Sequence, residues 1–148
     1  MTRTVTNIDE ANATLDYFNG FHDGFIKTLS IISHDVFEER GVQASSARLD
    51  LEIVFAHYNY QQDTRPADQL VTARFYEVMN LALDFSGRLH EWSVYEVFIA
   101  EANRALEDGR KEPCLQATLL QSRLTDNREW QRHEDLTFTF RRAVFEEA

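Results

Sequence analysis

The sequence predicts an α+β fold that is mainly β, with an N-terminal helix packed on an antiparallel sheet of about six or seven strands. We expect this sheet to be curled into a sandwich or a partial barrel. Apolar residues recur at the helical period near the N-terminus, whereas most later segments alternate apolar and polar residues. In both patterns the apolar residues lie on one side of the helix or strand. These apolar sides must be buried against one another, so the helix and the strands share a core. At 148 residues the chain is long enough to bury that core as a single globular domain over 1–148.

The helix is predicted over residues 8–19. Asn7, followed by Glu10, fits an N-cap with a carboxylate at the third helical position. Gly20 suits the C-terminal end, because glycine adopts the left-handed backbone without Cβ strain. The apolar stripe consists of Ile8, Ala11, Leu15 and Phe18.

The clearest strand covers residues 49–55. Its alternation points one set of side chains to the core and leaves Asp50 and Glu52 on a solvent face. The segment from Tyr76 to Asn80 breaks the alternation of its neighbours, which predicts a bulge or a tight bend. Similar alternation predicts further strands over residues 25–32, 71–75, 81–85, 115–119 and 136–141.

Residues 92–106 fit both a strand and a helix. Trp92, Val94 and Phe98 fit a strand, whereas the spacing of Trp92, Ala102 and Leu106 also fits a helix. Because its first half is rich in β-forming residues, we expect a strand over 92–99 that runs into a helical or irregular segment over 102–106.

The net charge of -10 argues against nucleic-acid binding, because phosphates would be repelled without a strong basic patch. An acidic surface can attract a basic protein partner, although the charge can also serve solubility alone. The chain has no run of about 20 apolar residues and no apolar segment at its N-terminus. We therefore expect no membrane span, no signal peptide and a cytoplasmic location.

The single cysteine, Cys114, excludes an intramolecular disulfide. No base or helix N-terminus is evident beside it, so a small half-buried residue is favoured over a nucleophile. None of the five histidines pairs with another at the spacing of local metal ligands. The sequence therefore indicates no metal site and no cofactor.

His57 continues the core-facing side of the 49–55 strand, where a polar ring needs a partner. A ligand-binding or acid/base site could combine His57 with His22 and Asp23. The structural alternative is favoured: Asp23 and Gly24 form a turn, His22 is a wedge beside it, and His57 makes a structural hydrogen bond.

A partner-binding face is a second possibility. Asp50 and Glu52 lie near Tyr58 and Tyr60 in the sequence, and exposed aromatics beside acidic residues suit a protein interface. Exposed aromatics could equally form the interface of a homodimer. Packing of the tyrosines in the core is the default interpretation.

Residues 21–26, Phe-His-Asp-Gly-Phe-Ile, follow the predicted helix and precede the predicted strands. This arrangement resembles a group of small bacterial proteins that open with a Phe-His-Asp motif, some of them immunity-protein-like and found beside polymorphic toxins. A later aromatic and aliphatic pattern of that group is matched by Phe75, Val78, Leu81 and Leu83. The resemblance implies a mainly β fold and a protein-binding role, and it carries over no catalytic residue.

The leading hypothesis is therefore a non-catalytic protein-binding module of the immunity type, with a basic protein as its partner. The alternative is a small-molecule-binding β-barrel or a weak enzyme that uses His22, Asp23 and His57.

Overall fold

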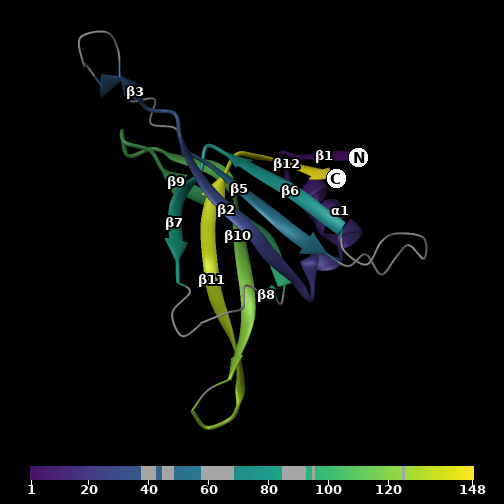
Figure 1. The fold of residues 1–148 in the computed structure, drawn as a ribbon. Helices are drawn as coiled ribbons and strands as arrows, with labels where there is room; N and C mark the ends of the chain where they lie inside the picture. The colour runs from purple at the N-terminus through teal and green to yellow at the C-terminus, as the bar shows by residue number, and fades with distance from the viewer. Residues whose placement is uncertain (38–42, 45–48, 58–68, 85–92, 95, 125) are drawn as a thin grey trace.

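The computed structural model describes residues 1–37, 43–44, 49–57, 69–84, 93–94, 96–124 and 126–148. In this part of the chain the fold is mainly β with one N-terminal α-helix, as predicted (Figure 1). The elements are β1 (Thr2–Val5), α1 (Ile8–Tyr17), the 3-10 turn η1 (Asn19–Phe21), β2 (Gly24–Ser33), β3 (Val36–Phe37), β4 (Gln43–Ala44), β5 (Leu49–His57), β6 (Gln69–Tyr76), β7 (Met79–Leu83), β8 (Ser93–Val94), β9 (Glu96–Ala105), β10 (Lys111–Leu124), β11 (Trp130–Phe140) and β12 (Arg142–Glu147).

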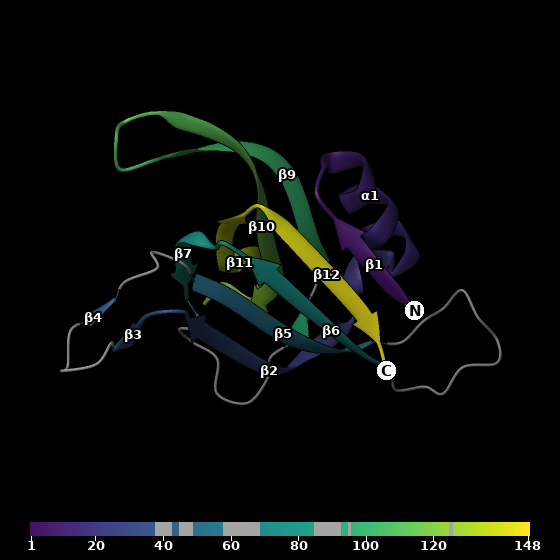
Figure 2. The same ribbon diagram turned by 90° about the horizontal axis from the view of Figure 1, so that it is seen from above.

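Two antiparallel sheets form the body. The larger has the strand order β1–β12–β6–β5–β2–β8, and the smaller has the order β7–β11–β10–β9. Their facing sides bury one hydrophobic cluster, to which phenylalanines from both sheets contribute. The β3–β4 hairpin stands away from this body, and the two termini lie side by side because β1 pairs with β12 (Figures 1 and 2).

The chain crosses from the larger sheet to the smaller one between β6 and β7. Glu77 has a φ of 54° there, and the amide of Val78 donates to the carbonyl of Leu49 at 2.7 Å. The predicted bulge or bend over residues 76–80 is thus confirmed, and it also changes the sheet to which the chain belongs.

Helix α1 begins as predicted. The Oδ1 atom of Asn7 accepts from the amide of Glu10 at 2.9 Å. The helix ends at Tyr17, earlier than predicted, and η1 follows with Gly20 at a φ of 61°. Among the described residues no helix is long and apolar enough to cross a membrane.

The expectation of a helical or irregular segment over 102–106 is wrong for residues 102–105, which belong to β9. Pairing decides this: Ala102 lies opposite Cys114 and Arg104 opposite Glu112 on β10, which overrides local propensity. Strand β12 has no counterpart among the predicted strands. Trp92 lies outside the described residues.

Candidate functional site

The corner that contains the Phe-His-Asp motif is a tight turn at the surface. Asp23 adopts a φ of 61°, and its Oδ2 atom lies 3.4 Å from Nε2 of His22. Both side chains are solvent-exposed to a large extent. The predicted turn is present, but Gly24 does not supply the positive φ; it is the first residue of β2 and lies against the backbone of β5.

His57 lies buried in the core, whereas His22 and Asp23 are exposed at the surface. Its ring is 2% exposed and meets the rings of Phe18 and Phe21 edge-on, with centroid distances of 5.8 and 5.4 Å. A ligand held at His22 and Asp23 would therefore find no exposed part of His57. This arrangement lends no support to a site built from the three residues.

Asp50 is not on a solvent face, and this prediction is wrong. Its side chain is 2% exposed, because the bend at Glu77 and the chain at His34 cover it. The Oδ1 atom of Asp50 accepts from the amide of Glu77 at 3.1 Å, and Oδ2 lies 2.7 Å from Nε2 of His34. The hydrogen bond from the Glu77 amide to Asp50 therefore stabilises the bend between the two sheets.

Glu52 does lie on the outer face of the larger sheet, where it forms an ion pair of 3.1 Å with Arg74. On the same face the guanidinium of Arg142 stacks 4.2 Å from the ring centroid of Tyr76. This face carries the paired charges that are usual for a solvated sheet. Tyr58 and Tyr60, which were predicted to join Glu52, lie outside the described residues.

The outer face of the smaller sheet has a different character. Three successive rows of side chains across its strands carry no charge. We call this surface the uncharged face; its members are Met79, Ala82, Phe98, Ala100, Ala102, Cys114, Gln116, Thr118, Thr137 and Thr139.

The uncharged face is open to solvent over most of its extent. Ala82, Ala100 and Gln116 are exposed, and the side chain of Phe98 is 42% exposed. Only Thr139 is buried among the ten members, since it contacts the start of β7. The residues on the opposite face of the same strands belong to the hydrophobic core.

Charged residues border the uncharged face at both ends. At one end Glu96 and Glu134 flank Leu120 from the neighbouring strands. At the other end Glu112 lies opposite Arg104. The border thus carries two glutamates at the first end, whereas at the second end the glutamate lies opposite an arginine.

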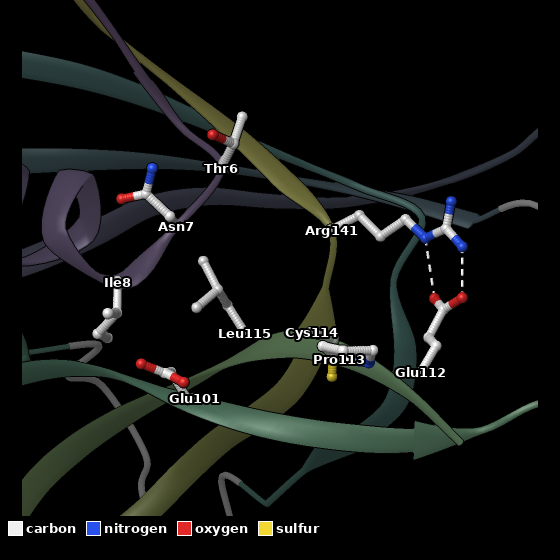
Figure 3. Close-up of a pocket in the computed structure, with 9 residues that line it drawn as sticks. All are labelled: Thr6, Asn7, Ile8, Glu101, Glu112, Pro113, Cys114, Leu115 and Arg141. Atoms are coloured by element: carbon white, nitrogen blue, oxygen red, sulfur yellow. Dashed lines mark hydrogen bonds and ion pairs between the residues drawn. The ribbon is translucent and has the colours of Figure 1, made fainter.

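The paired end is a network of arginine and glutamate side chains. Arg104 is 4% exposed; its Nε donates to Glu112 at 2.9 Å and its Nη1 donates to the carbonyl of Glu77. Arg141 forms a two-pronged pair with both oxygens of Glu112 (Figure 3). Hydrogen bonds from Arg141 and then Arg104 lower the pKa of Glu112 to about 2, and Glu112 raises the pKa of Arg141.

A cavity of about 550 Å³ opens beside this network. Figure 3 shows Asn7 and Ile8, at the start of α1, on one side of it, with Glu101 and Leu115 from the smaller sheet facing them. Cys114 also lines the cavity, and burial raises the pKa of its thiol. A thiol that stays protonated is a poor nucleophile, in agreement with the structural role expected for Cys114.

One histidine cluster was not anticipated. His133 lies between two carboxylates, with Nδ1 2.8 Å from Asp135 and Nε2 3.1 Å from Asp84. A bulge in β11 brings Asp135 into this position, which sequence spacing does not reveal. Within the described ranges, no group of three or more histidine, cysteine or acidic side chains is arranged to hold a metal ion.

The sequence does contain a signal for the uncharged face. In β9, β10 and β11 the positions between core residues hold alanine, threonine, glutamine, cysteine and one phenylalanine where charged residues are common. The buried half of this alternation predicts the strands, and the composition of the other half indicates the uncharged face. A scan against protein-family models and searches of curated proteins and of solved structures find no match for this chain.

Proposed function

We propose that the protein is a non-catalytic module that binds a basic protein through the uncharged face and its acidic border. The observation that carries this proposal is the contrast between the two outer sheet faces. The face of the larger sheet holds the Glu52–Arg74 ion pair, whereas ten neighbouring positions on the smaller sheet hold no charge. An exposed sheet face without charge suits the centre of a protein interface, where charged residues are depleted.

The area of the uncharged face is smaller than that of a stable protein interface. With strands about 4.8 Å apart and rows about 6.8 Å apart, the ten positions of the face cover roughly 330 Å². A stable interface buries about 800 Å² on each partner, so the contact must continue over the border. That border presents Glu96 and Glu134 in a chain of net charge -10, which favours a basic partner.

A second copy of the chain fits less well, because it would bring the same acidic border against itself. An immunity-type inhibitor of a basic toxin has the required properties, and the resemblance of residues 21–26 supports that role. The contact would weaken as salt rises, since screening acts on its charged border.

The test is affinity capture with three immobilised baits: the wild type, Ala100→Arg and the control Thr72→Arg. Ala100 is exposed on the uncharged face, and Thr72 lies on the outer face of the larger sheet. Both substitutions change the net charge equally, and a thermal melt checks that each variant is folded. We expect one basic protein to be retained by the wild type and by Thr72→Arg, and to be lost from Ala100→Arg.

Retention of that protein by all three baits would overturn the proposal, and so would the absence of any basic protein on the wild type. The native mass of the unbound protein provides a further check. A dimer that Ala100→Arg splits into monomers would assign the face to a second copy instead of a basic partner.

A further inference from the structure

Strand β2 leaves a long edge of the larger sheet open. On one side β5 pairs with it as far as Ser33, whereas on the other side β8 pairs only with Gly24 and Phe25. Figure 2 shows β2 at the margin of this sheet, on the side of β5 away from β6. Within the described part of the chain, residues 28–33 of β2 therefore have no strand on their second side.

This edge lacks the features that keep sheet edges from pairing. Residues 28–33 read Thr-Leu-Ser-Ile-Ile-Ser, without a charge, a proline or a glycine. The bulge in the pairing of β2 lies before this stretch, between Ile26 and Thr28. Ile31 is 52% exposed, although Leu51 opposite it on β5 is in the core. A long, uncharged and partly apolar edge is a template for a further strand.

The other strands at the sheet margins differ from β2. Strands β1, β7 and β8 have only four, five and two residues. Strand β9 is long, but helix α1 packs against it. Among the described strands, β2 is thus the one that combines length with an open side.

The charges at the two ends of this stretch favour a second copy of the chain as the added strand. Lys27 lies just before the stretch and Asp35 just after it, and both are exposed. Antiparallel pairing of two β2 strands brings Lys27 of each copy toward the Asp35 end of the other, where opposite charges attract. A two-fold contact of this kind also covers both open edges at once, so the assembly closes as a dimer.

We propose that two copies of the chain pair antiparallel through β2 and join their larger sheets into one continuous sheet. Leu29 and Ile31 lie on one face of β2, opposite Ile53 and Leu51, and in the dimer they meet the same residues of the second copy. The contact uses a different sheet from the uncharged face, so it does not depend on the proposed function. Its length of about 20 Å is small for an interface, so the dimer should dissociate on dilution.

Analytical ultracentrifugation of the full chain over about 1–300 µM tests the pairing. We expect the wild type to shift from monomer to dimer mass as its concentration rises. Ile31→Lys should weaken association at least about tenfold, because a charge on an edge strand opposes strand addition. Leu70→Lys is the matched control and should associate like the wild type, since Leu70 is 41% exposed on β6, which has a partner strand on each side.

A thermal melt checks that both lysine variants are folded. A wild type that stays monomeric at every concentration would overturn the proposal, and so would equal weakening by Ile31→Lys and Leu70→Lys. A dimer that Ala100→Arg splits but Ile31→Lys leaves intact would place the contact on the uncharged face instead, so the failure of this proposal is distinct from that of the proposed function.

A charge exchange tests the antiparallel orientation. Lys27→Glu and Asp35→Lys should each weaken self-association about tenfold, because like charges then meet at both ends of the paired strands. Mixed in equal amounts, the two variants should form a heterodimer with about the wild-type affinity, because opposite charges meet again at both ends. Native mass spectrometry with one variant isotopically labelled detects this heterodimer. A mixture without heterodimers would contradict the pairing of two β2 strands.

Discussion

The carbonyl oxygen of Ala56 lies 2.8 Å from the place that a Cβ atom would occupy on Gly24. The carbonyl oxygen of Phe21 lies 3.0 Å from the same place. Strand β2 can therefore start this close to β5 only with a glycine at position 24. The Phe-His-Asp-Gly segment thus acts as a corner whose glycine permits close approach, and Asp23 carries the left-handed backbone.

Replacing this glycine should destabilise the fold. Gly24→Ala forces the two carbonyls apart, which we expect to lower the free energy of unfolding by about 2 kcal/mol, a typical cost of overpacking. Urea denaturation followed by circular dichroism measures the change. Ser30→Ala, at an exposed position of the same strand, is the control and should stay within about 0.5 kcal/mol of the wild type. Equal stability of the two variants would mean that β2 and β5 separate freely at this point.

The pairing of Glu112 predicts a dependence of stability on pH. Its pKa of about 2 in the folded protein lies below the ordinary value of 4.5. The stabilisation from this group is therefore complete above about pH 4.5 and is lost as the pH falls through about 2. Thermal melts should show a steeper loss over this window for the wild type than for Glu112→Gln, which cannot titrate. Parallel curves would contradict the pairing with Arg141 and Arg104.

His22 and His57, the two histidines of the alternative site, should behave differently. His57→Ala empties a buried position between aromatic rings and should cost about 2–4 kcal/mol of the free energy of unfolding. His22→Ala changes a half-exposed side chain and should cost less than about 0.5 kcal/mol. Chemical denaturation of both variants measures the difference. Similar losses from the two substitutions would instead indicate that the histidines share one environment.

Cys114 should react slowly with thiol reagents. Burial raises the pKa of its thiol, so less thiolate is present at a given pH. At pH 8 we expect alkylation by iodoacetamide to be about fivefold or more slower in the folded protein than in the same chain unfolded in urea. Mass spectrometry follows the modified fraction over time. A folded-state rate that matched or exceeded the unfolded rate would identify an activated thiol.

Local signals in the sequence were sufficient for several elements. Asn7 and Glu10 predicted the start of α1, and the alternation over 49–55 predicted β5. The break at 76–80 predicted the bend between β6 and β7. These features depend on hydrogen bonds and burial within a few residues, which explains why periodicity detects them.

Features that depend on distant partners could not be predicted in this way. Asp50 occupies a polar position of its strand but is buried, because the backbone at Glu77, 27 residues later, folds over it. Ala102 favours a helix by propensity, yet pairing with Cys114 places it in a strand. The uncharged face is assembled from four strands, so it becomes apparent only when their register is known.

The most direct test of the central claim is partner retention by Ala100→Arg and Thr72→Arg, compared at equal bait density. Both variants add one positive charge to an outer sheet face, and only Ala100 belongs to the uncharged face. The proposed function predicts that a basic protein held by the wild type is also held by Thr72→Arg and is lost from Ala100→Arg. Loss from both variants, or retention by both, would contradict it.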